Sequence, residues 1–97
     1  MNLLHTLEDL IRTLDYNFSN IQGADHDLLM PLFNRYSRKY DRKPMSPEKE
    51  PGIIKMIEEI IPLIEKHYDS FDNVNKADSL KLIAEYRNFV AKRNLSI

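Results

Sequence analysis

The stretch PGIIKMIEEIIPLIEKHY, residues 51 to 68, most constrains what this chain can fold into. Isoleucine favours strands and an interior proline disrupts helices, so the segment first suggests a strand or a broken helix. On a helical wheel, however, its isoleucines and Tyr68 fall within an arc of roughly 120°, and its charged residues fall elsewhere. A strand would alternate with a period of two, and the frequent charges exclude a bilayer span. The spacing therefore predicts one helix whose core face holds Ile53, Ile54, Ile57, Ile60, Ile61, Ile64 and Tyr68.

Pro62 lies almost opposite this stripe on the wheel. Its ring removes the hydrogen bond to the Glu58 carbonyl, which then faces water. A disruption on the solvent side curves a helix around its core. We therefore expect a helix bent at Pro62, with Pro51 in its first turn.

The same apolar spacing occurs fifty residues earlier, in Leu3, Leu4, Leu7, Leu10, Ile11, Leu14 and Phe18. Duplication of a helical hairpin would explain this, but so would the spacing that core-facing helices share. In either case the first and third helices should present equivalent faces.

Three short connections separate the predicted helices: NIQGAD, RKPMSPEKEPG and SFDNVNKAD. We expect helices at about 2–21, 26–43, 50–70 and 76–93. Asn2 is the expected first cap, Asp25 or Asp27 the second, and Asn75 the fourth, with Asp78 completing a capping box. A cap at Asp27 would place Pro31 in the first turn. Because short connections reverse the chain direction, residues 1–97 should form a single all-α domain, an antiparallel four-helix bundle.

The fourth predicted helix is apolar on two sides. Leu80, Ile83, Ala84 and Val90 form one face, which we expect to pack in the core. A second face, together with neighbouring arginines, has the residue types enriched at interface hot spots. The predicted partner surface is Leu82, Tyr86, Arg87, Phe89 and Arg93, unless another part of the chain covers it.

Basic residues crowd the end of the second helix: Arg35, Arg38, Lys39, Arg42 and Lys43. They complement the helix dipole, and they could also contact a protein or an anionic membrane surface. Nucleic-acid binding is a weaker interpretation, because the chain carries a net charge of −1.

Several kinds of catalytic or metal site lack support in the sequence. The chain has no cysteine, which excludes disulfides and thiolate chemistry. His5, His26 and His67 lack the spacing of paired metal ligands, and no glycine-rich phosphate loop is present. Ser46 and Lys49 form an S-x-x-K string that we interpret as a helix entry. We expect no enzyme activity, metal, cofactor or small-molecule substrate.

The N-terminal segment MNLLHTLEDLIRTLDYNF carries four interrupting charges and no basic leader, so we expect neither a signal peptide nor a spanning helix. The predicted location is the cytoplasm, with a peripheral place at the inner face of the membrane as a further option.

Four segments, in this order, carry a likeness to a known family: the leucine-rich first helix, DLLMPLFNRYSRKYD, EPGIIKMIEEI and LKLIAEYRNFV. In this layout the chain resembles the small immunity proteins that protect bacteria from their own class IIa, pediocin-like bacteriocins, the enterocin A immunity type in particular. The resemblance implies a cytosolic antiparallel four-helix bundle without enzymatic activity. It also implies recognition of the mannose phosphotransferase permease when bacteriocin is bound, with specificity in the fourth helix and AKRNLSI.

Two other functions stay open at this point. A small helical regulator or adaptor could bind nucleic acid through Arg35, Arg38, Lys39 and Arg42. A helical enzyme could use Asp25, His26 and Asp27, although helix capping explains these residues more simply.

Overall fold

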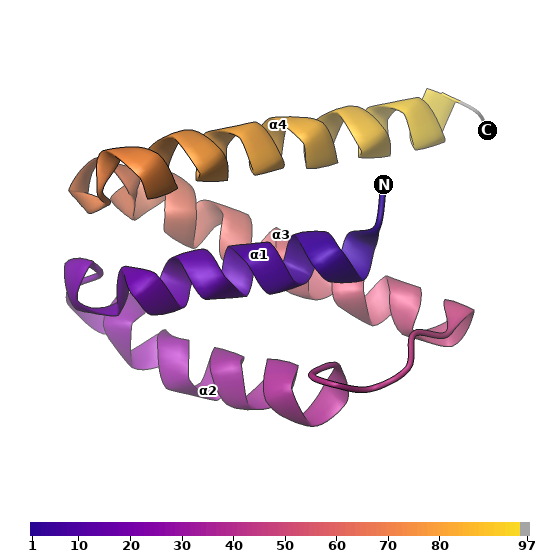
Figure 1. Ribbon diagram of the computed structural model, residues 1–97, viewed down its shortest axis with the longest axis horizontal. Helices are drawn as coiled ribbons and strands as arrows, with labels where there is room; N and C mark the ends of the chain where they lie inside the picture. Colours follow the sequence, from indigo (N-terminus) through magenta and orange to yellow (C-terminus); the bar gives the residue numbers. More distant parts are fainter. Residues whose placement is uncertain (96–97) are drawn as a thin grey trace.

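Helices account for nearly all of the backbone in the computed structural model, which describes residues 1–95. Its elements in chain order are α1 (Leu3–Tyr16), η1 (Phe18–Asn20), α2 (Ala24–Lys39), η2 (Pro47–Lys49), α3 (Glu50–His67), η3 (Tyr68–Ser70) and α4 (Asn73–Leu95). The α elements are α-helices and the η elements are single 3₁₀ turns. The prediction of an all-α, antiparallel four-helix bundle is confirmed (Figure 1).

The four helices form two consecutive hairpins with a shared centre. We call α1, η1 and α2 the first hairpin, and α3, η3 and α4 the second. Figure 1 shows α1 in front of α3, with α4 along one side of this pair and α2 along the other. The closest packing is between α1 and α3, and α1 also packs against α4. The centre of the bundle is therefore built from one helix of each hairpin.

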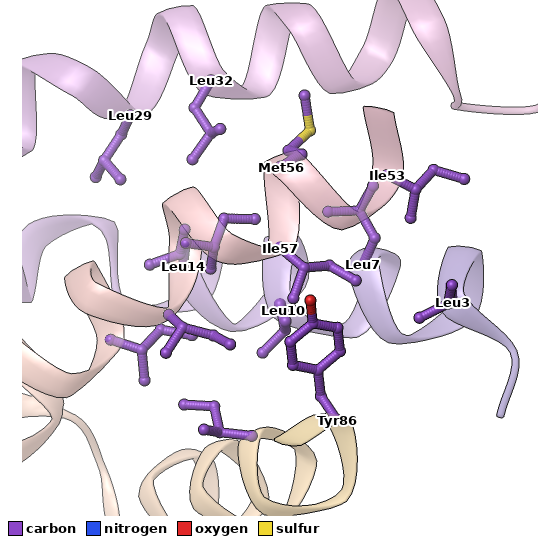
Figure 2. Close-up of a cluster of buried hydrophobic side chains, with 14 of the residues drawn as sticks. Leu3, Leu7, Leu10, Leu14, Leu29, Leu32, Ile53, Met56, Ile57 and Tyr86 are labelled. Atoms are coloured by element: carbon purple, nitrogen blue, oxygen red, sulfur yellow. The ribbon is translucent and has the colours of Figure 1, made fainter. Parts of the chain in front are cut away.

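Leucines of α1 and isoleucines of α3 form the core of the bundle. Leu7, Leu10 and Leu14 are fully buried, as are Ile57, Ile60 and Ile64, and Leu29 and Leu32 close the core from α2 (Figure 2). Burying one such side chain contributes about 1.5–3 kcal/mol. The prediction that the first and third helices present equivalent faces is confirmed, and Pro62 lies exposed on α3.

The turn of the first hairpin differs from the prediction. α1 ends at Tyr16 rather than near residue 21, because the buried Asn17 donates its side-chain amide to the Thr13 carbonyl, 2.9 Å away. α2 begins after Gly23, whose φ of 73° suits only glycine at low strain. Neither Asp25 nor Asp27 is the cap, and Pro31 lies inside α2 rather than in its first turn.

The turn of the second hairpin also begins its helix earlier than predicted. The carboxylate of Asp72 accepts a hydrogen bond from the Asn75 backbone amide at 2.9 Å, so Asp72 caps α4 instead of Asn75. α4 then runs from Asn73 to Leu95. The side-chain amide of Asn75 also donates to Oδ2 of Asp72 at 2.6 Å, so Asn75 is a partner of the cap rather than the cap itself.

Gly52 allows the connection between the hairpins to pack closely. A Cβ atom at Gly52 would lie 2.5 Å from the hydroxyl of Tyr40, well inside van der Waals contact. Tyr40 ends α2 and is buried. The absence of a side chain at Gly52 therefore lets this tyrosine close the end of the core.

Within residues 1–95, no helix combines the length and the apolar character needed to cross a bilayer.

Candidate interaction surfaces

Tyr86, predicted to lie on a partner surface, is part of the core. Its side chain is only 1% exposed and points from α4 toward α1 and α3 (Figure 2). Its hydroxyl donates to Oε1 of Glu58 at 2.6 Å, which satisfies the polar end of a large buried ring. Burial first, and then the Glu58 carboxylate, raises the pKa of Tyr86. The predicted exposure of Tyr86 is wrong, because a tyrosine can bury its ring when its hydroxyl has a partner.

The two faces of α4 are partly interchanged relative to the prediction. Leu82 and Phe89 are half-buried and pack against the core beside Tyr86. Ile83 is buried as predicted, whereas Ala84 is exposed and Leu80 keeps 44% of its surface in solvent. The large apolar residues that α4 exposes are therefore Val74 and Leu80, and Leu82 and Phe89 present only their edges.

The two arginines predicted for the partner surface also tie α4 to α3. Arg87 donates to Oε1 of Glu65 at 2.9 Å, and Arg93 forms an ion pair with Glu50. The Arg93 guanidinium also lies 5.7 Å from the centre of the Phe89 ring. Exposed ion pairs of this kind contribute about 0–1 kcal/mol each. The guanidinium groups of Arg87 and Arg93 therefore stay accessible, because little free energy is needed to release them from their carboxylate partners.

The predicted basic patch separates into two parts. Arg35 donates to both carboxylate oxygens of Glu59, at 3.4 and 2.9 Å, and so belongs to the contact between α2 and α3. The other four residues, Arg38, Lys39, Arg42 and Lys43, lie exposed at the end of α2 and just beyond it. In the described part of the chain, no carboxylate forms an ion pair with any of these four.

Asp25, His26 and Asp27 do not converge on one site. Asp25 Oδ2 lies 2.8 Å from Nε2 of His67 and 2.9 Å from Nζ of Lys66, at the end of α3. His26 instead places Nδ1 3.0 Å from the Ile21 carbonyl, where it closes the first turn, and Asp27 is exposed. The hydrogen bond to His67, followed by that to Lys66, lowers the pKa of Asp25.

The contact between Asp25 and His67 was not predicted from the sequence, because the two residues are 42 positions apart. The available signal was an acidic first turn in α2 and a basic last turn in α3, which attract when the two helix ends meet. Among residues 1–95, no three His, Asp or Glu side chains are arranged to hold a metal ion.

The S-x-x-K string belongs to a local turn. Ser46 precedes η2, and its carbonyl accepts a hydrogen bond from the Lys49 backbone amide at 3.0 Å. The Lys49 ammonium donates to the Pro44 carbonyl at 2.6 Å rather than to the Ser46 hydroxyl. The two residues thus form the entry to α3, as predicted.

An apolar groove between α2 and α3 was missed from the sequence. Leu28, Pro31 and Leu32 line one wall, Pro62 and Leu63 line the other, and the Arg35–Glu59 ion pair lies beside them. The groove measures about 400 Å³. The available signal was an interior proline in each helix, because an interior proline removes one backbone hydrogen bond and kinks the helix at that point.

No protein-family model matches this chain, and no curated protein and no solved structure matches it either.

Proposed function

We propose that this chain is a non-enzymatic immunity protein that protects its cell from a class IIa, pediocin-like bacteriocin. In this proposal it acts in the cytoplasm, at the inner face of the membrane, and recognises the bacteriocin-bound mannose phosphotransferase permease. The observation that carries the proposal is the helical layout that the resemblance implies. The proline-glycine entry leads into the isoleucine-rich α3, and this helix packs at the centre against a leucine-rich α1.

The proposed contact surface is the outward side of α4, revised from the sequence-based set. Leu80, Ala84 and Arg87 are exposed and follow one another at helical spacing. Leu82, Phe89 and Arg93 lie on the other flank of α4, beside α1 and the N-terminal residues, and are not part of this surface. Tyr86 supports the surface from beneath through its contact with Glu58.

A helix that serves only a core would place its apolar residues on one side. α4 instead keeps Leu80 and Val74 in solvent while it buries Ile83 and Tyr86. Apolar residues on both sides favour a helix that contacts both a core and a partner. Ser96 and Ile97, which the resemblance also assigns to recognition, lie outside the described residues.

The proposal is tested by expressing the chain in a bacteriocin-sensitive strain and challenging it with a panel of pediocin-like bacteriocins. We expect survival against one or a few members of the panel, and no protection against a lanthionine-containing bacteriocin that does not use the permease. Cells with an empty vector provide the reference. Full sensitivity to every member of a broad panel, with the protein present and folded, would contradict the proposal.

The contact surface is tested with the double variant Leu80→Ser and Arg87→Gln, since both side chains are exposed and their replacement leaves the core intact. The matched control is Met30→Ser and Arg12→Gln, which removes one exposed apolar residue and one exposed cation from the first hairpin. We expect the bacteriocin concentration that the cells survive to fall at least about tenfold for the first variant only, which corresponds to about 1.4 kcal/mol of lost binding. Equal protection by both variants would assign recognition to another surface.

A further inference from the structure

Charge is distributed unevenly along the long axis of the bundle. The end that holds the start of α1, the end of α2, the start of α3 and the end of α4 comprises residues 1–8, 36–55 and 88–95 (Figure 1). We call it the basic end, because it carries eight Lys and Arg against four Asp and Glu. The opposite end, residues 14–28 and 62–80, carries two lysines against seven Asp and Glu. The molecule is thus electrically polarised although its net charge is only −1.

The charges of the basic end are largely uncompensated. The Lys43 and Lys49 ammonium groups donate to backbone carbonyls of Arg38 and Pro44, which carry no formal charge. Within residues 1–95, ion pairs with carboxylates are absent for the basic-end residues Arg38, Lys39, Arg42, Lys43, Lys49 and Lys55. The field at this end is therefore positive, apart from the pair that Arg93 forms with Glu50.

Exposed methionines lie among these cations. Met1 is 50% exposed and Met45 is 46% exposed, and both line one open hollow together with Leu3 and Phe89. Flexible apolar side chains surrounded by lysine and arginine are suited to the boundary between lipid headgroups and acyl chains. Each cation near an anionic lipid surface adds to the attraction.

A nucleic-acid ligand fits the same end less well. Binding to single strands uses aromatic faces on which bases stack. The two tyrosines near the cations are not available for stacking, because Tyr40 is buried and Tyr36 is half-buried. Among the described residues of this end, the large apolar side chains that are exposed are the thioethers Met1 and Met45.

From this geometry we infer that the basic end docks end-on against an anionic lipid bilayer, with Met45 at the lipid boundary and the acidic end directed away. This inference goes beyond the proposed function and does not rest on it, since it follows from charge and exposure alone. It also predicts that the groove between α2 and α3 and the outward side of α4 stay accessible when the protein is docked.

The test is flotation of the purified protein with vesicles of phosphatidylglycerol and phosphatidylcholine, compared with vesicles of phosphatidylcholine alone. We expect binding only to the anionic vesicles, and a loss of binding as salt shortens the screening length from about 30 Å at 0.01 M to 8 Å at 0.15 M. Absence of binding to the anionic vesicles at low salt would overturn the inference.

Variants locate the binding surface. In the basic-end variant, Arg38→Gln, Lys39→Gln, Arg42→Gln and Lys43→Gln remove four cations. The matched control, with the same net charge, carries Arg12→Gln, Lys66→Gln, Lys76→Gln and Lys81→Gln outside that end. We expect affinity to fall by about fivefold for each basic-end cation, and by less than about threefold in total for the control. Equal losses in the two variants would overturn the inference.

If circular dichroism shows that the fourfold basic-end variant does not fold properly, two milder variants test the inference instead. Lys39→Gln with Arg42→Gln removes only two exposed cations and should lower affinity about 25-fold. Met45→Ser should lower it a few-fold without changing its salt dependence. Tighter binding to a nucleic-acid duplex than to the anionic vesicles would overturn the inference. Head-to-tail self-association at low salt, in place of flotation with the anionic vesicles, would overturn it as well.

Discussion

The two hairpins correspond to each other across fifty residues, well beyond the apolar stripes of α1 and α3. Each central helix leads into a 3₁₀ turn, Phe18–Asn20 or Tyr68–Ser70. A buried apolar residue, Ile21 or Phe71, follows each turn. Tyr36 and Tyr86 are likewise fifty residues apart. Burial raises the pKa of both tyrosines, and Glu8 and Glu58, respectively, raise it further.

The hairpins differ in where their polar groups find partners. Asn17 bonds within its own hairpin, to the Thr13 carbonyl, whereas the corresponding His67 bonds to Asp25 in the other hairpin. Tyr86 is buried and donates to Glu58, whereas Tyr36 is half-buried. The comparison teaches that one packing pattern supports both hairpins, and that the second hairpin adds the polar contacts that join α3 to its neighbours.

The largest expected effect tests whether the central helices are equivalent. Leu10→Ala and Ile60→Ala each remove a fully buried side chain at corresponding positions, so each should lower the free energy of unfolding by about 2–5 kcal/mol. Urea denaturation measures both, with the exposed Leu28→Ala as a control that should change it by less than about 0.5 kcal/mol. A large loss in one variant and almost none in the other would break the correspondence.

The next effect concerns the entries to α2 and α4. Gly23→Ala places a side chain at φ 73° and ψ −146°, although no atom would clash with it, so the cost is backbone strain of about 1–3 kcal/mol. Asn73→Ala, at the corresponding and exposed position, should cost less than about 0.5 kcal/mol. Similar midpoints of urea unfolding for the two variants would show that the first turn does not depend on its glycine.

A smaller effect distinguishes the two tyrosines. Tyr86→Phe removes the hydrogen bond to Glu58 and should lower the free energy of unfolding by about 1 kcal/mol. Tyr36→Phe should change it little near neutral pH. Equal effects of the two substitutions in urea denaturation would remove this difference between the hairpins.

The stability of the protein at alkaline pH gives a second measurement that concerns the tyrosines. Burial raises the pKa of Tyr36 to about 12, from an ordinary value of 10.0. The contribution of the Tyr36 hydroxyl to the free energy of unfolding is therefore fully present below pH 10 and is lost as the pH rises toward 12. The decline should be shallower in Tyr36→Phe, as followed by thermal unfolding at a series of pH values.

The smallest effect concerns two carboxylates, one that joins the hairpins and one that caps α4. Hydrogen bonds to His67 and to Asn75 lower the pKa of Asp25 and of Asp72, respectively, below the ordinary 3.8. Their stabilisation is present above about pH 4 and is lost as the pH falls through the lowered pKa. Asp72→Asn should keep the cap but flatten this acid decline, because asparagine caps helices without titrating. An unchanged decline in both Asp72→Asn and Asp25→Asn would contradict the assignment.

Periodicity was sufficient to predict the fold because α1 and α3 are strongly amphipathic. Leu7, Leu10 and Leu14 can pack in only one direction without exposing themselves, and the same holds for Ile57, Ile60 and Ile64. The short connections then left an antiparallel bundle as the simplest arrangement. Helix boundaries were less accurate, since Gly23 and Asp72 cap their helices through backbone and side-chain geometry that several nearby residues could have supplied.

The candidate surfaces were harder to predict, for a physical reason visible in α4. Apolar residues surround this helix, so its sequence does not say which side faces the core. Tyrosine is common at interfaces, which favours an exposed position for Tyr86. The partner of its hydroxyl, Glu58, lies 28 residues away on another helix, so the sequence around Tyr86 does not indicate that it is buried. The pairing of Arg35 with Glu59 likewise depends on the tertiary arrangement, so neither contact has a local signal.

The central pairing of α1 with α3 also determines how the chain can acquire its structure. Each hairpin keeps one half of the core, and its own second helix covers only part of that half. An isolated hairpin would leave its stripe of leucine or isoleucine in water, and two short helices gain too little from local bonds to stay ordered. Neither half is therefore an autonomous folding unit, and cleavage at the exposed connection around residues 41–45 should yield two fragments that gain structure only by associating with each other.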